Sequence, residues 1–232
     1  DVVRAALSTS ANQYEWMLAH LPADAAKPLP RTFDHGRLVT VPTRDWTSGF
    51  FPGSLWYLFE ATGDGKWRAA AEKFTGLLAP EQHNTQTHDV GFMLYCSYGN
   101  GLRLTGNEAY KSVLLNGAQS LSTRFNPTVG AIKSWDPGVG PYTYPVIIDN
   151  MMNLELLTWA AKNGGDPKLR DIAISHADKT LANHFRPDGT AYHVVDYDPK
   201  TGWIRAYHAN QGADVRTPWA RGQSWGLYGY TM

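Results

Sequence analysis

Helical periodicity is the feature of this 232-residue sequence that most restricts its fold. Apolar residues recur at spacings of three and four, which is the pattern of amphipathic helices. Gly and Pro punctuate most of the junctions between these stretches. The pattern therefore predicts an all-α fold, with helices near residues 2–20, 53–62, 66–79, 89–104, 107–124, 149–163, 167–184 and 219–232.

A short turn recurs between pairs of these helices, at Gly63-Asp64, Gly106-Asn107 and Gly165-Asp166. In each turn we expect Gly to end one helix in the left-handed conformation and Asp or Asn to cap the next. The helix before the turn is the more apolar one, and the helix after it carries charges on one face. Repeated inner and outer helices predict a solenoid or a closed ring of hairpins. Because Gly-Asp is a common turn between helices, a chance recurrence stays open.

Two stretches interrupt the helical rhythm. Residues 126–147 are rich in Gly, Pro and Tyr and are predicted to form a long ordered loop. Residues 190–208 alternate in polarity, with His193 and Tyr197 on one face, and predict a small β-hairpin that turns at 198–202. Binding and catalytic residues usually lie on long ordered loops of this kind, held by a rigid helical scaffold.

Both ends of the sequence are unusual. It begins at Asp1 with neither an initiator Met nor a signal peptide, which indicates processing or trimming. It ends at Met232 within a predicted helix, with no capping residue or breaker. We therefore expect one catalytic domain over residues 1–232 whose C-terminal part is missing.

Composition excludes several functions. Lys plus Arg and Asp plus Glu both number 21, so the global charge indicates no polyanionic partner such as nucleic acid. No apolar stretch approaches the roughly 18 residues that span a bilayer, and no metal-ligand spacing or phosphate loop is present. We thus expect no membrane partner, no metal and no cofactor. The single cysteine, Cys96, lies among apolar residues and is predicted to be a packed thiol.

Two acidic residues are the main candidates for chemistry. Asp149 follows an apolar run and opens a predicted helix, with Asn153 one turn along on the same face. Apolar neighbours raise the pKa of such a carboxyl, whereas a helix N-terminus lowers the pKa. Asp89 stands at a similar junction, so the two carboxyls could meet in one pocket as paired acids for glycosidic chemistry. Either residue could instead be a simple helix N-cap.

The last predicted helix carries a second group of candidates. Arg221 and Trp225 lie four residues apart, and Tyr228 follows on that face. A guanidinium beside an indole can bind a carboxylate while the ring stacks on a sugar, but it can also be a cation–π pair inside the core. The 12% of aromatic residues suits sugar binding only slightly better than core packing. His193 and Gln211 lie on loops, where such residues are most often surface groups.

Four segments carry a stronger signal in combination: Trp46–Trp56, Thr87–Phe92, Ile148–Asn153 and Trp219–Gly226, in this order. Together they resemble glycoside hydrolase family 88, the unsaturated glucuronyl hydrolases. The resemblance implies an (α/α)6 barrel, which agrees with the predicted helical hairpins. Such a barrel has twelve helices and about eight are predicted here, so the missing C-terminal third could carry part of the pocket.

The resemblance also implies a mechanism. The substrate is an oligosaccharide whose terminal uronic acid carries a C4=C5 double bond left by a lyase. The residue matching Asp149 protonates C4 and helps deliver water to C5, after which the hemiketal rearranges and the glycosidic bond breaks. Asp89 matches a second acidic position that binds ring hydroxyls and tunes Asp149. The substrate-binding residues implied are Trp46, His88, Trp135, Asn153, His193, Gln211, Arg221 and Trp225, with Arg221 or His193 facing the uronate.

Three other interpretations remain at this point. An unsaturated rhamnogalacturonyl hydrolase shares the barrel and the chemistry but acts on pectin fragments. A non-catalytic sugar-binding protein would use the aromatic residues as a platform, with Asp89 and Asp149 as helix caps. Another (α/α)6 enzyme, an endoglycanase or an epimerase, would act on saturated sugars. For the favoured interpretation we expect a bacterial protein of the cytoplasm or periplasm.

Overall fold

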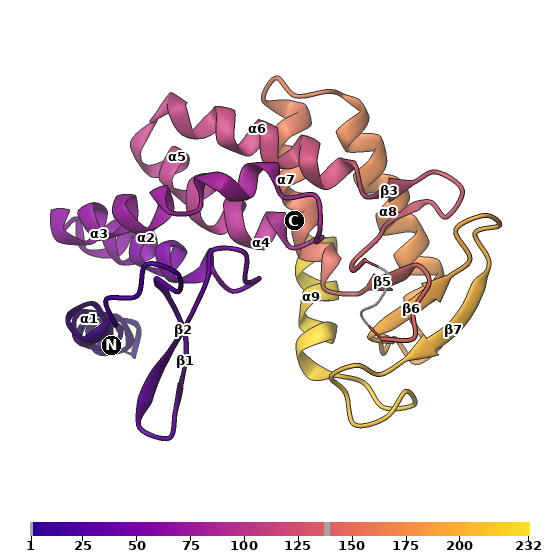
Figure 1. Ribbon diagram of the computed structural model, residues 1–232, viewed down its shortest axis with the longest axis horizontal. Helices are drawn as coiled ribbons and strands as arrows, with labels where there is room; N and C mark the ends of the chain where they lie inside the picture. The colour runs from indigo at the N-terminus through magenta and orange to yellow at the C-terminus, as the bar shows by residue number, and fades with distance from the viewer. Residues whose placement is uncertain (1, 137–139) are drawn as a thin grey trace. The chain divides into compact units, whose positions relative to one another are not determined.

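The computed structural model describes residues 2–136 and 140–232, drawn as a ribbon in Figure 1. These residues group into two compact units. The first unit extends to residue 82 and includes residues 92–114, and the second contains residues 83–91 and 115–232. One catalytic domain over the whole chain stays a prediction.

The helices follow the predicted ranges closely. They are α1 (Val2–His20), α2 (Phe50–Thr62), α3 (Gly65–Gly76), α4 (Val90–Leu94), α5 (Asn100–Thr105), α6 (Glu108–Ser122), α7 (Asn150–Lys162), α8 (Lys168–His184) and α9 (Ala220–Thr231), with a 3-10 helix η1 (Ala79–His83) and a π-helix η2 (Tyr95–Gly99). The helix predicted over 89–104 is thus divided by η2 into three parts. No helix in the described ranges is long and apolar enough to cross a membrane.

The strands form three small sheets. They are β1 (Leu29–Asp34), β2 (Arg37–Val41), β3 (Phe125–Asn126), β4 (Ala131–Ile132), β5 (Pro145–Ile147), β6 (Val194–Tyr197) and β7 (Ile204–His208), all paired antiparallel as β1-β2, β3-β4 and β5-β6-β7. The hairpin predicted over 190–208 is confirmed as β6 and β7. The predicted loop over 126–147 is corrected, because it contains β4 and β5; its residues 137–139 lie outside the described residues.

Two of the three predicted helical turns form as expected. Gly63 and Gly106 end their helices with φ of 70° and 66°. The third turn differs, because its left-handed residue is Gly164, with φ of 102°, and the prediction for Gly165 is wrong. Gly165 is needed for a close approach instead, since a Cβ there would lie 2.9 Å from the carbonyl oxygen of Ala160. Gly164 therefore adopts the left-handed conformation of the turn, and Gly165 allows the backbone to pass close to Ala160.

The core of the first unit lies under the α2–α3 hairpin. Trp56 and Trp67 are fully or almost fully buried, and the Trp56 indole donates a hydrogen bond of 3.0 Å to Thr75 Oγ1. Each large side chain buried in this way contributes about 1.5–3 kcal/mol. A Cβ at Gly53 would lie 2.8 Å from the carbonyl oxygen of Cys96, so α2 approaches η2 at this glycine.

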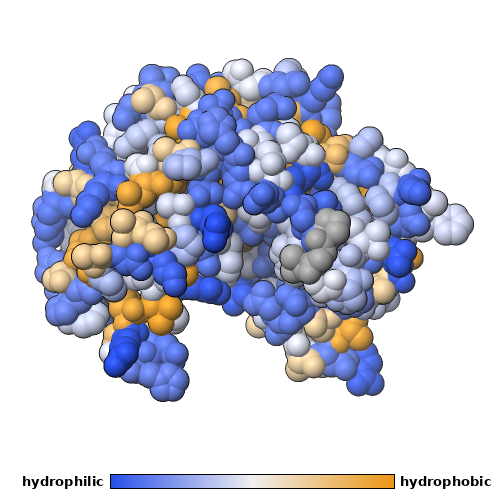
Figure 2. All heavy atoms as spheres, in the orientation of Figure 1, coloured by the Kyte–Doolittle hydropathy of each residue, from blue (hydrophilic) through white to orange (hydrophobic). Residues whose placement is uncertain are grey.

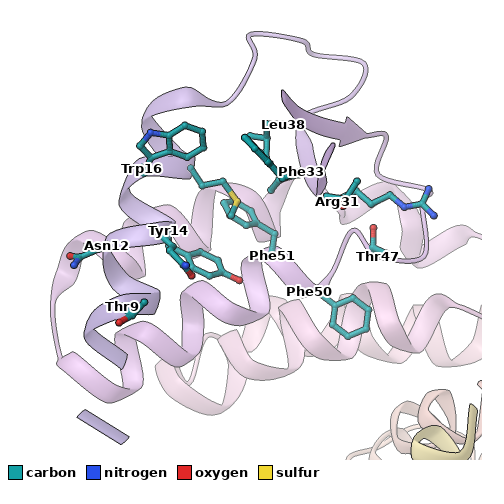
Figure 3. A pocket seen from close by; sticks show the side chains of 14 residues that line it. Thr9, Asn12, Tyr14, Trp16, Arg31, Phe33, Leu38, Thr47, Phe50 and Phe51 are labelled. Atoms are coloured by element: carbon teal, nitrogen blue, oxygen red, sulfur yellow. The ribbon is translucent and has the colours of Figure 1, made fainter. Parts of the chain in front are cut away.

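A groove of about 790 Å³ also belongs to the first unit, between α1, the β1–β2 hairpin and the start of α2 (Figure 3). Trp16 and Phe33 line it and are 47% and 58% exposed. Figure 2 shows apolar side chains gathered on this unit, at the left of the view. The β1–β2 hairpin is not predicted from the sequence, although His35 and Gly36, with φ of 45° and 75°, form its two-residue turn.

The second unit joins helices to the three-stranded sheet. Helix α7 packs against both α8 and α9, and β6 is the central strand. Val146 of β5 pairs with Val195 of β6, and both belong to a buried cluster with Tyr144 and Tyr197. Because β5 leads directly to the start of α7, the residues between them are held by a buried strand on one side and a buried helix on the other.

Candidate active site

Asp149 lies at the junction between β5 and α7. Its φ of −56° and ψ of −29° are already helical, and its side chain makes no capping hydrogen bond. The residue is only 9% exposed, and its Oδ1 has no hydrogen-bond partner among the described residues. A buried carboxyl that neither caps a helix nor receives a hydrogen bond at Oδ1 is costly for stability. The N-cap alternative for Asp149 is therefore excluded, and a functional role is favoured.

The surroundings of Asp149 favour its neutral form. Burial raises the pKa of Asp149 to about 6, and the charge of Asp89 adds to this effect. The charges of His88 and Arg221 lower the pKa but do not outweigh burial. Desolvation thus prevails over the helix N-terminus, and below about pH 6 the carboxyl holds the proton that a general acid must donate.

The raised pKa of Asp149 makes the free energy of unfolding depend on pH. The folded state binds the Asp149 proton up to about pH 6, whereas the unfolded state loses it near pH 3.9, so stability falls as pH rises between these values. Asp149→Asn cannot ionise, and we expect it to be more stable than the wild type above pH 6 by up to about 3 kcal/mol. Denaturant midpoints at pH 5 and pH 7.5 measure the difference, which should fall to about half at pH 5.

Asp188 provides the control for this measurement. It is an exposed carboxylate whose pKa is lowered by hydrogen bonds from the side chain and backbone of Thr190. Asp188→Asn should therefore give no gain in stability at pH 7.5. Equal midpoints for wild type and Asp149→Asn at pH 7.5 would contradict the desolvation of Asp149.

His193 precedes β6 and faces Asp149. Its Nδ1 accepts a hydrogen bond of 3.1 Å from the backbone N–H of Gln211, so the neutral ring carries its proton on Nε2. Nε2 lies 3.6 Å from Asp149 Oδ1, slightly beyond hydrogen-bond distance. Burial, with the charges of nearby cations, lowers the pKa of His193 to about 4. His193 is therefore a neutral donor directed at the carboxyl at neutral pH.

Asp89 precedes α4 and is the second acid of the site. Its Oδ2 accepts a hydrogen bond of 2.6 Å from Thr87 Oγ1, and its Oδ1 lies 3.1 Å from His88 Nε2. Burial alone raises the pKa of Asp89, but the charge of His88 and the hydrogen bonds of His88 and Thr87 outweigh it, so the pKa lies below its ordinary value. At a pH between the two pKa values, Asp89 is thus ionised while Asp149 is still protonated. Such a separation of two pKa values gives one carboxyl the role of acid and the other that of its ionised partner.

Gly91 brings the Asp89 segment against α7. A Cβ at Gly91 would lie 2.7 Å from both Cα and Oδ1 of Asn153, which no side chain could occupy without movement. Asn153 is fully buried and lies one turn after Asp149, as the sequence predicts. This contact explains how two acids sixty residues apart belong to one site.

Arg221 lies at the start of α9. Its guanidinium lies 4.5 Å from the ring of Trp219 and donates a hydrogen bond to Gln211 Oε1. Trp219, which the sequence does not single out, thus provides an indole beside Arg221, and Trp225 is half-buried one turn further along the helix. Since Arg221 is exposed, the alternative of a cation–π pair inside the core is excluded. Trp219 also packs on His193, with ring centroids 4.3 Å apart.

The two other predicted aromatic residues lie in different units. Trp135 packs on Tyr142 with ring centroids 5.6 Å apart, and Tyr142 packs edge-on to His208 of β7 at 4.9 Å. Trp46 belongs to the first unit and packs edge-on to Phe92 at 5.6 Å. Substrate binding by Trp46 and Trp135 stays a prediction. Over residues 2–136 and 140–232 no three His, Cys, Asp or Glu side chains are grouped to hold a metal ion.

Paired carboxyls with separated pKa values, on a scaffold of helical hairpins, are the equipment of enzymes that break glycosidic bonds. The model of the Glycosyl Hydrolase Family 88 matches residues 24–232, so the chain belongs to this family. The resemblance found in the sequence is thereby confirmed.

Individual relatives are similar over most of the chain. It is 48% identical over 193 residues to an unsaturated glucuronyl hydrolase of Formosa agariphila, covering 83% of this chain and 48% of the relative. It is 32% identical over 208 residues to an unsaturated chondroitin disaccharide hydrolase of Streptococcus agalactiae, covering 88% of this chain and 52% of the relative. The chain therefore spans about half the length of these bacterial relatives.

Solved structures agree with the predicted fold class. A crystal structure of an unsaturated glucuronyl hydrolase specific for heparin matches with a TM-score of 0.90 and 46% identity, over 97% of this chain and 60% of that one. The unsaturated glucuronyl hydrolase of Bacillus sp. GL1 matches with a TM-score of 0.83 and 29% identity, over 98% of this chain and 60% of that one. The predicted class, helical hairpins of an (α/α)6 barrel with a small β-hairpin, is confirmed.

Proposed function

We propose that this chain carries the catalytic carboxyls of an enzyme that removes a 4,5-unsaturated hexuronic acid from the non-reducing end of lyase-generated oligosaccharides. The observation that carries the proposal is Asp149, a buried acid with a pKa of about 6 beside an ionised Asp89 and a neutral His193. The names of the relatives support the same reaction.

Asp149 provides the proton in this reaction. The C4=C5 bond of the substrate is an enol ether, so a proton placed on C4 leaves an oxocarbenium ion at C5. Water adds to C5, and its proton returns to the Asp149 carboxylate. The hemiketal opens by breaking the bond between C5 and the ring oxygen, which leaves a ketone at C5 and a hemiacetal at C1. The hemiacetal then breaks its bond to the glycosidic oxygen, so that C1 becomes an aldehyde and the rest of the oligosaccharide leaves as an alcohol. A carboxyl with a pKa near the working pH serves both as the acid and as the base.

The neighbours of Asp149 bind and orient the ring. Arg221 is exposed, is held in place by Gln211 and Trp219, and offers a planar donor for the uronate carboxylate. Asp89 is an ionised acceptor for ring hydroxyls, and His193 offers its Nε2–H near the reacting atoms. The site thus combines an acid (Asp149), an ionised acceptor (Asp89), a cation (Arg221) and a neutral donor (His193).

Glycosaminoglycan fragments are the substrates that we propose. The relatives and solved structures are named for chondroitin disaccharides and for heparin. Pectin fragments are less well supported, because none of the relatives compared above is named for them. A sugar-binding protein without catalysis would have no use for a carboxyl kept neutral by burial, which disfavours that alternative.

The proposal is tested with unsaturated disaccharides from hyaluronan, chondroitin and heparin digested by lyases. Loss of the ultraviolet absorbance of the conjugated C4=C5 carboxylate reports hydration directly. Because Asp149 must be protonated, we expect the rate to fall tenfold for each pH unit above about 6. Saturated disaccharides are the control and should not react. Unchanged absorbance with all three substrates at pH 5–6 would refute the proposed function.

A further inference from the structure

Ser134 is a fully buried residue that contacts both acid-bearing segments. Its carbonyl oxygen accepts a hydrogen bond of 3.3 Å from the N–H of His88, the residue before Asp89. Its N–H donates to the carbonyl oxygen of Pro145 at 2.8 Å, and its Oγ accepts from the N–H of Ile147 at 2.9 Å. One serine thus joins the segment of Asp89 to β5, which leads to Asp149.

The bonds of Ser134 complete the pairing of a very short strand. On one side, β5 pairs with β6, and Ile148 N–H continues this side with a 3.0 Å bond to His193 O. On the other side, where a further strand would lie, Ser134 bonds to both ends of β5. Since β5 has three residues, its alignment depends on the bonds at both edges. Two residues after Ile147, the chain reaches Asp149.

We propose that Ser134 is a positioning residue that sets the separation between the carboxyls of Asp89 and Asp149. This inference rests on the proposed function, because it concerns the same two acids. Ser134 bonds directly to the backbones of both segments, to His88 on one side and to Pro145 and Ile147 on the other. A displacement of about 1 Å in a catalytic group can cost ~100-fold in rate, so a fastening residue of this kind has a measurable effect.

The Ser134→Ala variant removes one of the three bonds. The N–H of Ile147 is then left buried with no acceptor, and the end of β5 is free to shift. We expect kcat to fall by about tenfold or more, with KM changed by less than about twofold, because the ring-binding side chains stay in place. The charge of Asp89 raises the pKa of Asp149, so a wider separation should move the alkaline limb of the rate profile to lower pH.

Ser97→Ala is the matched control. Ser97 is also fully buried, but its hydroxyl donates to carbonyl oxygens of the preceding helical turn, at 2.6 Å to Met93 and 3.3 Å to Leu94, and not to either acid-bearing segment. It should lower the unfolding temperature without changing kcat or the pH profile. If Ser134→Ala does not fold, Ser134→Cys keeps the volume, offers only a weak acceptor, and is measured in the same way.

A measurement that does not depend on enzymatic activity tests the role of Ser134 separately from the proposed function. The pKa of Asp149, followed by carboxyl ¹³C NMR in the wild type and in Ser134→Ala, should be lower in the variant. Wild-type protein without activity would overturn the proposed function but would leave this comparison intact. A folded variant with unchanged kcat and unchanged Asp149 titration would overturn the role of Ser134.

Discussion

Asp149→Asn is expected to lower the rate of hydration of an unsaturated disaccharide by about 10²–10⁴-fold, the usual contribution of a general acid. A carboxamide has nearly the same shape and fills the same buried place, but it has no acidic proton to give to C4. The ring-binding groups, Arg221 and Asp89, are unchanged by the substitution. We therefore expect the loss in kcat, while substrate still binds.

Single-turnover absorbance and equilibrium binding of the disaccharide measure the two quantities separately. Asp166→Asn is the matched control, because Asp166 is exposed just before α8 and its side chain accepts from the N–H of Lys168, a bond that an Asn side chain can also accept. This control should keep full activity. Near-normal turnover in Asp149→Asn would remove Asp149 from the mechanism, and loss of binding in parallel with turnover would assign it a role in binding instead.

The helices were predictable because their signals are local. The 3.6-residue period gives the bounds of α7 and α8 to within one or two residues, and the apolar run before Asp149 correctly indicates burial. The left-handed Gly63 with Asp64 capping the next helix is equally local, since the cap bond reaches only to Lys66. Such features need no knowledge of distant segments.

The features that sequence reasoning missed depend on distant segments. Strand β5 exists because β6 pairs with it almost fifty residues later, and nothing in its three residues requires that partner. The tautomer of His193 is set by the backbone of Gln211, and Trp219 packs on both His193 and the Arg221 guanidinium. The two acids, and His88 and Arg221 whose charges act on Asp149, could be named from the sequence, but the hydrogen bonds that orient them could not.

Loss of stability in acid is the second large effect, and it arises from two buried histidines of α8. His176 Nδ1 accepts from the N–H of Ile132 at 2.9 Å, and His184 Nε2 donates to the carbonyl oxygen of Val146 at 2.9 Å. Both rings are fully buried and fasten α8 to the strands. Burial lowers the pKa of His176 to about 3 and that of His184 to about 4, so both are neutral in the folded protein.

The direction of the pH dependence follows from these values. The unfolded chain binds protons at both rings as pH falls through 6.5, whereas the folded chain does not until about pH 4 and 3. These two histidines therefore do not change the free energy of unfolding above pH 7, and they lower it progressively as the pH falls below 6.5. The combined loss reaches at most about 8 kcal/mol at pH 3, from 1.36 kcal/mol per pKa unit, which is comparable to the whole stability of an ordinary domain.

His184→Gln tests this origin of acid unfolding, because the Gln amide can still donate to Val146 O but does not titrate. We expect it to be less stable than wild type at pH 7.5 and to lose less stability between pH 6.5 and 4.5, so that the two urea midpoints converge. His20→Gln, at an exposed histidine, should keep the wild-type slope. Parallel slopes for wild type and His184→Gln would mean that His184 is protonated in the fold. The acid sensitivity would then have to come from the other groups with lowered pKa values, His176, His193 and the carboxylates.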